Sequence, residues 1–150
     1  MSNLEIPILQ SNDEIPIPRY AYAGDAGVDL RSTESFVLKP MERKLVSTGI
    51  SLEIPDGYAG LVMPRSGLAI KHGISIVNAP GLIDSNYRGE IKVPLINLDQ
   101  NENFEVAVGD RIAQLVIIKV PEVDFIKVNE LSETNRGARG FGSSGVTLDK

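Results

Sequence analysis

Glycine and proline interrupt this chain every few residues, and the segments between them are rich in β-branched side chains. The 150 residues include nine prolines, fourteen glycines, 16 isoleucines and 13 valines, spread over the whole length. Branched side chains favour pleated strands and lose rotamer freedom in helices. The pattern predicts strands over nine short runs: Leu4–Leu9, Arg43–Ser47, Ile50–Ile54, Tyr58–Met63, Ile74–Val77, Ile91–Leu98, Phe104–Val108, Ile112–Val120 and Val123–Val128.

The same pattern leaves room for one helical turn or short helix, over Gly67–His72. No helical pattern of roughly 10 to 15 residues lies between the expected strands, which disfavours a doubly wound nucleotide-binding fold. The length fits one domain, and the chain contains no internal repeat and no linker. We therefore expect residues 1–150 to form a single all-β domain with short connections.

Composition excludes several classes of function. Cysteine is absent and there is one histidine, which rules out disulfide frameworks, thiolate zinc sites, cysteine nucleophiles and multi-histidine metal clusters. A net charge of −5 disfavours direct binding of nucleic acid, although a locally basic pocket can still hold a small anion. There is no signal-peptide pattern, and apolar runs fall far short of the roughly 20 residues of a membrane span. The expectation is a cytoplasmic protein without membrane contact.

The composition changes near the C-terminal end. From Asn129 the apolar periodicity stops, and four glycines fall between Gly137 and Gly145. A segment so poor in apolar groups gains too little from burial to offset its ordering entropy. It is either a frayed terminus or, because two arginines and an aromatic ring lie among the glycines, a clamp for a phosphorylated base. We expect residues 129–150 to form a flexible arm.

Four further stretches combine glycine with charged or amide side chains. The first, AGDAGVDL at 23–30, carries Asp25 and Asp29. Hard carboxylate oxygens suit Mg²⁺, which keeps most of its waters and is usually shared with substrate phosphates. The alternative is an ordinary Asp-Gly turn that enters a strand.

The second stretch, PRSGLAIKHG at 64–73, places Arg65, Ser66 and the Gly67 amide at the start of the expected helical turn. These groups are the donors of a phosphate site. A serine before a helical turn is also a common N-cap, and the two roles are compatible. His72, without an evident partner, is interpreted as structural.

The third stretch, VNAPGLIDSNYRGEIKV at 77–93, is the richest in functional groups and has the pattern of a hairpin. A hairpin places alternate residues on one face, so Asp84 and a neighbour would line a shared pocket. There Asn78 could read a nucleobase edge and Asp84 could take a proton from water. The alternative is a hairpin whose turn uses Asp, Ser and Asn as ordinary turn formers.

The fourth stretch, GDRIAQLVI at 109–117, contains an amide in an otherwise apolar run. Asp110 and Arg111 are interpreted as turn residues that open a buried strand. Gln114 must find polar partners there, and either a phosphate or a neighbouring backbone would supply them.

These four stretches and the tail RGARGFGSSG at 136–145 resemble, in order and spacing, the five motifs of the homotrimeric dUTP diphosphatases (dUTPases). The resemblance covers almost the whole chain. It implies an all-β, jelly-roll-like β-barrel with at most one short helix. It also implies a homotrimer with active sites at subunit interfaces, and a C-terminal arm that folds over a neighbour's site.

The resemblance implies hydrolysis of dUTP to dUMP and pyrophosphate, which keeps uracil out of DNA and supplies dUMP for thymidylate synthesis. Asp84 would activate the water that attacks the α-phosphorus. Asp29 would hold Mg²⁺ through metal-bound water, with the ion bound mainly by the triphosphate. Arg65, Ser66 and Gly67 would grip the phosphates, and Gln114 would assist them.

The same resemblance implies how the base and sugar are bound. Asn78, with the backbone of Leu82, Ile83 and Lys92, would read the uracil edge. Tyr87 would pack on the sugar face and leave no room for a ribose 2′-hydroxyl. In the arm, the resemblance implies that Arg136 would reach the terminal phosphates and that Phe141 would stack on uracil. Hydrogen bonds to the γ-phosphate would come from Gly142, Ser143 and Ser144.

Two positions depart from the family pattern. Arg139 stands where glycine is more frequent, and Asp25 stands where serine is common, so Asp25 is not assigned to the metal. Two alternatives remain: a dCTP deaminase-like enzyme of the same fold, and a non-catalytic nucleotide-binding regulator. Phe141 in the tail and the Asp84–Tyr87 arrangement favour the dUTPase.

Overall fold

The computed structural model describes residues 4–141, which contain eleven strands and one helix. The helix α1 (Ser66–His72) has seven residues, and no helix within 4–141 is long and apolar enough to cross a membrane. The strands are β1 (Ile8–Gln10), β2 (Val28–Arg31), β3 (Phe36–Leu38), β4 (Arg43–Ser47), β5 (Ile50–Leu52), β6 (Tyr58–Met63), β7 (Ile74–Ile76), β8 (Gly81–Ile83), β9 (Lys92–Asn97), β10 (Phe104–Val106) and β11 (Arg111–Lys119).

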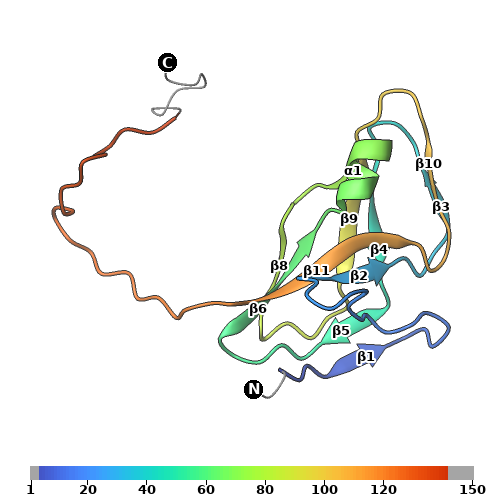
Figure 1. The fold of residues 1–150 in the computed structure, drawn as a ribbon, viewed down its shortest axis with the longest axis horizontal. Coiled ribbons are helices and arrows are strands. Elements are labelled where there is room, and N and C mark those ends of the chain that lie inside the picture. Colours follow the sequence, from blue (N-terminus) through green and yellow to red (C-terminus); the bar gives the residue numbers. More distant parts are fainter. Residues whose placement is uncertain (1–3, 142–150) are drawn as a thin grey trace.

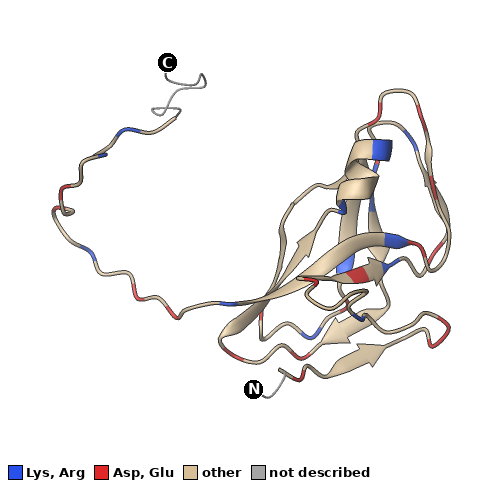
Figure 2. Ribbon diagram, in the orientation of Figure 1, with Lys and Arg blue, Asp and Glu red and all other residues tan. Residues whose placement is uncertain are grey.

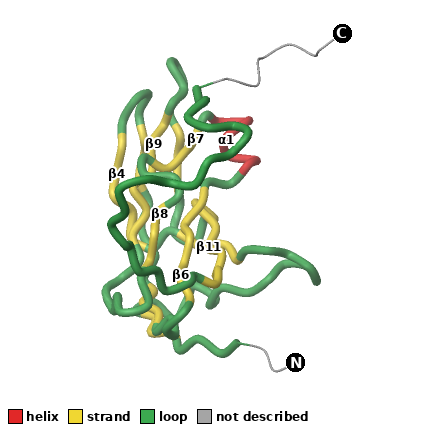
Figure 3. Tube along the Cα trace, turned by 90° about the vertical axis from the view of Figure 1, so that its left-hand side faces the viewer, coloured by secondary structure: helices red, strands yellow, loops and turns green. Residues whose placement is uncertain are grey.

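The strands form four antiparallel sheets (Figure 1). The largest has the order β2-β11-β6-β8, the next has the order β4-β9-β7, and β1-β5 and β10-β3 are two-stranded. Figure 3 shows β4 and β9 at one side of the body and β6 and β11 further across it. Over residues 4–141 the strand pairs do not close into one ring, but the arrangement is jelly-roll-like and all-β, as expected.

Alternate side chains of the two larger sheets point into one core. In β9, for example, Val93, Leu95 and Asn97 are buried and the residues between them are not, which is the period of two expected of a strand with one buried face. The buried amide of Asn97 is satisfied because it donates to the carbonyls of Leu38 at 3.0 Å and Glu102 at 2.9 Å. Paired strands and satisfied polar groups give the sites described below a fixed frame.

Most of the strand predictions are confirmed. β4 and β6 have the predicted bounds, six other runs overlap a strand whose bounds differ, and α1 begins one residue before the predicted turn. The prediction for Val123–Val128 is wrong: this run is exposed and lies outside the strands. It has the composition of a strand but no partner among residues 4–141, and an unpaired strand is not stable in water. β2, β3 and β8 were missed.

The expected hairpin over 77–93 is also wrong. β8 pairs with β6, whereas β9 pairs with β4 and β7, so the chain crosses from one sheet to the other between Ile83 and Lys92. The Ile91 N–H donates to the Ile50 carbonyl at 2.8 Å, which fixes the far end of this crossing away from β8. The segment 84–91 is therefore a loop between two sheets.

After β11 the chain leaves the body. The Val120 N–H donates to the Gly57 carbonyl at 2.9 Å, and the remaining described residues, 121–141, are all exposed. Figure 1 shows this arm extending away from the sheets. Its hydrogen bonds within the described range are local, as between Arg136 and Arg139.

Candidate active site

The loop between β8 and β9 borders a cavity of about 630 Å³, here called the Asp84 cavity. Five of the residues predicted to bind or react with substrate line it together. Its full lining is Leu45, Leu82, Ile83, Asp84, Tyr87, Glu90, Ile91 and Lys92. Although the hairpin prediction is wrong, the expected grouping of Asp84 with its neighbours is present, because the loop curls back over the cavity.

A tight turn places Asp84 and Tyr87 on this cavity. The Tyr87 N–H donates to the Asp84 carbonyl at 3.1 Å, and the Arg88 guanidinium donates to the Ser85 carbonyl at 2.6 Å. The Asp84 side chain has no hydrogen-bond or ion-pair partner among residues 4–141. The Tyr87 hydroxyl, by contrast, donates to the Glu90 carbonyl at 3.0 Å. The cavity thus presents a free carboxylate beside an anchored aromatic ring.

Asn78 lies next to this group without lining the cavity. It is exposed in the turn before β8, where a Cβ added at Gly81 would come 3.4 Å from its amide nitrogen. The Asn78 amide therefore lies close to the start of β8. The preceding Ala79–Pro80 bond is cis.

A second cavity of about 500 Å³, here called the Asp29 cavity, lies where β2, β6 and β11 meet. In the sheet register Asp29 is opposite Gln114, which is in turn opposite Met63. Gln114 donates to the Pro64 carbonyl at 2.8 Å and so fixes the residue before Arg65. The neighbouring backbone, one of the two partners considered for Gln114, is thus present within the fold.

Two arginines hold the Asp29 carboxylate. Arg65 Nε lies 2.9 Å from Oδ1, and Arg111 Nε lies 3.4 Å from Oδ2. The cavity wall also contains Arg19 and Asp25, which gives it three guanidinium groups and two carboxylates. Its excess positive charge suits a polyanion. Figure 2 shows that elsewhere acidic and basic residues are interspersed along the body and the arm.

The contribution of Arg111 was missed by the sequence analysis. Strict alternation would place Arg111 and Gln114 on opposite faces of β11, but the pairing of β11 with β2 shifts register between Arg111 and Ala113. Such an irregularity re-aims a side chain, and it brings both residues to the same cavity. An arginine three residues before the half-buried amide of Gln114 was the available signal.

Ser66 and Gly67 begin α1 next to Arg65. The N-cap is Arg65, with φ −92° and ψ 126° and no side-chain cap hydrogen bond, so the interpretation of Ser66 as an N-cap is wrong. Ser66 is instead the first helical residue. A Cβ added at Gly67 would meet nothing within 4 Å, which leaves its backbone open to an approaching group.

The arm residues are not brought to either cavity. Arg136 and Phe141 are exposed, and neither cavity has an arm residue in its lining. Gly142, Ser143 and Ser144 lie outside the described residues. The predicted site residues therefore fall into three groups within one chain.

Within residues 4–141 no three acidic or histidine side chains gather closely enough to hold a metal ion. Both oxygens of Asp29 face guanidinium groups, so this carboxylate suits a bridging water better than direct coordination. Asp25 accepts the Tyr22 N–H at 2.8 Å and stabilises a turn.

Comparison with known proteins identifies the family. A protein-family model described as dUTPase matches residues 13–145, which include all five stretches. The chain belongs to the dUTPase family. Relatives of similar length bear this out: the deoxyuridine 5'-triphosphate nucleotidohydrolase of Corynebacterium glutamicum is 56% identical over 142 residues, which cover 95% of each chain.

Other dUTPase relatives are nearly as similar. The deoxyuridine 5'-triphosphate nucleotidohydrolase of Leifsonia xyli is 50% identical over 145 residues, 97% of this chain and 93% of that protein. Among solved structures, the dUTPase of Staphylococcus bacteriophage 80alpha with dUpNHpp has a TM-score of 0.88 at 30% identity, and the match covers 96% of this chain and all of that one.

A mutant dUTPase from phage phi11 of S. aureus has a TM-score of 0.79 at 25% identity, and the match covers 87% of this chain and all of that one. Its structure concerns the coordination of a structural Mg(II) ion. Membership of the dUTPase family confirms the resemblance. It favours the dUTPase over the other two hypotheses, a dCTP deaminase-like enzyme and a non-catalytic nucleotide-binding regulator.

Proposed function

We propose that this chain hydrolyses dUTP to dUMP and pyrophosphate. The observation that carries the proposal is the dUTPase match over residues 13–145, which spans a free Asp84 carboxylate and an arginine-rich cavity. The first supplies a proton acceptor and the second supplies charge for a triphosphate. Removing dUTP and supplying dUMP would keep uracil out of DNA and feed thymidylate synthesis.

Asp84 acts as the general base in this proposal. Its carboxylate accepts a proton from a water molecule, whose oxygen attacks the α-phosphorus. The bond from the α-phosphorus to the oxygen that bridges the α- and β-phosphates breaks, and pyrophosphate leaves with that oxygen. Because phosphoryl transfer depends mainly on positioning and charge, one free base with well-placed cations is sufficient.

The phosphates are held by the groups around Asp29. Arg65 and Arg111 are oriented by that carboxylate before substrate arrives, and Ser66 and Gly67 follow Arg65 directly. Gln114 supports this segment through Pro64. Orientation in advance lowers the cost of ordering the guanidinium groups when the substrate binds.

Mg²⁺ is the proposed cofactor. It would be bound mainly by the triphosphate, with Asp29 contacting it through water, in keeping with the small number of free carboxylates around the cavity. When bound, the ion neutralises charge that develops across the phosphates. The dUTPase family and the Mg(II)-containing phage relative support this choice.

Specificity for uracil and deoxyribose is assigned to the Asp84 cavity. Asn78 and the backbone of Leu82, Ile83 and Lys92 would read the base. A tight pocket excludes the thymine methyl group by clash, and cytosine presents a donor where uracil presents an acceptor. Tyr87 would exclude a ribose 2′-hydroxyl.

The complete site is proposed to form in a homotrimer. Within residues 4–141 the Asp84 cavity, the Asp29 cavity and the arm are separate, which supports a site assembled from several chains. Residues 129–150 would act as an arm of the single domain that closes over a neighbour's site. There, Arg136, Phe141, Gly142, Ser143 and Ser144 would contact the nucleotide. A small-molecule substrate, no nucleic-acid partner and a cytoplasmic location complete the proposal.

The first experiment is a product assay with Mg²⁺ on dUTP, dCTP, dTTP and UTP, with nucleotides resolved by chromatography and pyrophosphate measured. Production of dUMP and pyrophosphate from dUTP alone would support both reaction and specificity. Conversion of dCTP to a uracil nucleotide, or no product from any substrate, would contradict the proposal.

The role of the arm is tested by truncation after Glu133. Because residues 121–141 are exposed, we expect the shortened chain to retain its thermal unfolding temperature. Turnover of dUTP should fall about 100-fold or more through loss of charge-assisted contacts to the phosphates. Full activity of a folded truncated chain would exclude the closing role.

A further inference from the structure

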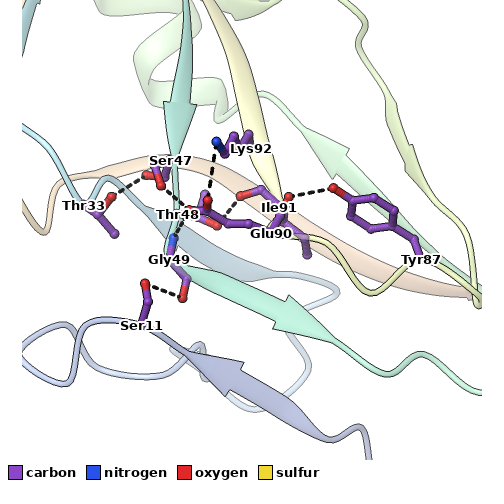
Figure 4. Close-up of polar contacts among 9 residues, drawn as sticks. All are labelled: Ser11, Thr33, Ser47, Thr48, Gly49, Tyr87, Glu90, Ile91 and Lys92. Carbon is purple, nitrogen blue, oxygen red and sulfur yellow. Dashed lines mark hydrogen bonds and ion pairs between the residues drawn. The ribbon is translucent and has the colours of Figure 1, made fainter.

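Glu90, which lines the Asp84 cavity, forms the centre of a polar network (Figure 4). Its Oε1 accepts hydrogen bonds from the Ser47 hydroxyl and from the Gly49 N–H, the latter at 2.8 Å. Its Oε2 lies 3.6 Å from Lys92 Nζ. A side chain that lines the cavity is thus tied to the turn between β4 and β5.

That turn is itself fixed. The Gly49 φ of 70° favours glycine, and an added Cβ would come 2.8 Å from Thr33 Cγ2 and 2.9 Å from Ser11 Oγ. The Ser11 N–H donates to the Gly49 carbonyl at 2.8 Å, and the Thr33 N–H donates to the Ser47 carbonyl at 3.0 Å. Two segments that are distant in sequence, around Ser11 and Thr33, therefore hold the residues to which Glu90 binds.

The next residue after Glu90 is fixed to the same turn. Ile91 is buried, its N–H donates to the Ile50 carbonyl, and its carbonyl accepts the Thr48 hydroxyl. Glu90 is half-buried, whereas Tyr87 and Arg88 before it in the loop are exposed. The Glu90 carbonyl lies in the same planar peptide as the Ile91 N–H, so the hydrogen bond to Ile50 fixes one side of residue 90, and the Glu90 side chain anchors the other side through Ser47 and Gly49.

The Glu90 carbonyl in turn holds Tyr87. The Tyr87 hydroxyl donates to it at 3.0 Å, and a Cβ added at Gly89 would overlap the phenol ring. The ring therefore lies against the backbone of residues 89 and 90, and its direction follows from theirs. Within residues 4–141 the Tyr87 side chain forms no other hydrogen bond.

We infer that Glu90 is a positioning residue, which fixes the Tyr87 ring on the cavity wall and thereby sets the discrimination between deoxyribose and ribose nucleotides. This inference rests on the proposed function, because it assigns Glu90 to the sugar-binding part of the proposed dUTPase site. Glu90 itself does not touch the reacting atoms in this scheme. Its carboxylate is held ionised: burial raises its pKa, but the Ser47 hydroxyl, the Gly49 N–H and Lys92 together lower it below the ordinary value.

The test measures kcat and KM for dUTP and for UTP in the full chain and in Glu90→Ala. Loss of the anchoring hydrogen bonds should lower the selectivity for dUTP over UTP by about fivefold, through a higher KM for dUTP. The kcat for dUTP should stay within about twofold, since Asp84 is unaffected. Glu90→Gln keeps an oxygen that accepts from Ser47 and Gly49, and it should restore most of the selectivity.

Glu34→Ala is the matched control. Glu34 pairs with Lys44 at 3.3 Å, and its side chain is about as exposed as that of Glu90, but it lies outside the cavity. Removal of a surface ion pair alone should leave selectivity unchanged. If Glu34→Ala lowers selectivity as much as Glu90→Ala does, the assignment is overturned.

A double-mutant cycle with Tyr87→Phe tests whether Glu90 acts through Tyr87. If it does, the two substitutions together should lower selectivity by no more than the larger single effect, because both break the same chain of contacts. Additive effects, or an equal fall in kcat and selectivity, would show that Glu90 supports the structure generally. If Glu90→Ala does not fold, Ser47→Ala weakens the same anchor, and unchanged selectivity there would equally overturn the inference.

Failure of the inference differs from failure of the proposed function. If the unmodified chain releases no dUMP from dUTP, the proposed function fails. If the unmodified chain is active and selective while Glu90→Ala has the same selectivity, only the role of Glu90 fails.

Discussion

Asp84 and Asp29 are the same residue type in two cavities of one chain, and their surroundings give them different capacities. The Asp84 carboxylate is exposed and unpaired within the described residues, whereas both oxygens of Asp29 face arginine nitrogens, at 2.9 and 3.4 Å. A free carboxylate can accept a proton from water. A carboxylate that is held by two guanidinium groups instead orients those arginine side chains toward a bound substrate.

The backbone causes this difference. Asp84 follows the end of β8, in a loop that crosses between sheets, so no neighbouring strand presents a side chain opposite it. Asp29 lies inside β2, where pairing with β11 brings Arg111 and Gln114 within reach. Asp84 is free because it lies beyond the end of a strand, which suits the proposed base. Asp29 is paired because it lies inside a strand, which suits the residue proposed to orient the arginines.

The largest expected effect comes from Asp84→Asn. The amide keeps the shape of the side chain but cannot accept the proton, so kcat for dUTP should fall about 100- to 10,000-fold. Nucleotide binding, measured by calorimetry with an unreactive dUTP analogue, should stay within about threefold. Near-normal turnover would remove Asp84 from the role of base and erase the contrast with Asp29.

Mixing two inactive variants tests whether the two cavities act in one site. Asp84→Asn and Arg65→Ala should each be nearly inactive, but co-expressed chains should regain about one quarter of wild-type activity if a site takes these residues from different subunits. Each of the two positions in a site is then occupied by the wild-type residue half of the time, so one site in four has both.

If both residues act from the same chain, no mixed assembly contains an intact site, and activity stays at the level of the separate variants. Size-exclusion chromatography with light scattering on the same samples reports whether mixed trimers form. A monomer in this measurement would contradict the proposed homotrimer directly.

The sequence could predict much of the strand content, because runs such as Arg43–Ser47 and Tyr58–Met63 carry their own alternation or apolar character. It could not predict pairing. The run at 77–93 has the local chemistry of a hairpin, but β8 and β9 join different sheets through contacts with residues far away in sequence. The run at 123–128 has strand chemistry and no partner in the described chain.

The same limit applies to the candidate site. The motifs identified Asp84, Tyr87 and Arg65 by their chemistry, but Arg111 was read as a turn residue because the register shift in β11 depends on its pairing with β2. Glu90 was not singled out, since its partners Ser47 and Gly49 are some 40 residues away. Local composition identifies reactive groups, and tertiary contacts identify what holds them.

A smaller loss is expected from Asp29→Asn. The amide can accept from one arginine but turns its N–H groups toward the other, so the phosphate-binding cluster loses order. We expect KM for dUTP to rise about tenfold and the Mg²⁺ concentration for half-maximal activity to increase, with kcat changed less than in Asp84→Asn. Asp25→Asn is the comparison within the same cavity and should lose less, because Asp25 binds the Tyr22 N–H and no arginine. Equal losses would indicate that cavity charge, rather than the orientation of the arginines, is responsible.

The smallest expected effect concerns the contribution of Glu90 to stability in acid. Burial raises the pKa of Glu90, but hydrogen bonds from Ser47 and Gly49 and the charge of Lys92 lower it below the ordinary value of 4.5. A carboxyl group with a lowered folded pKa stabilises the fold above its unfolded pKa, and this contribution is lost as the pH falls through the folded value. Between pH 7 and pH 3 the free energy of unfolding should therefore fall further in the unmodified chain than in Glu90→Gln, by about 1 kcal/mol or less for a partly exposed pair. Urea unfolding at a series of pH values measures the difference. Parallel curves for the two proteins would mean that the charge of Glu90 contributes nothing to the fold, and that its hydrogen bonds alone hold the loop.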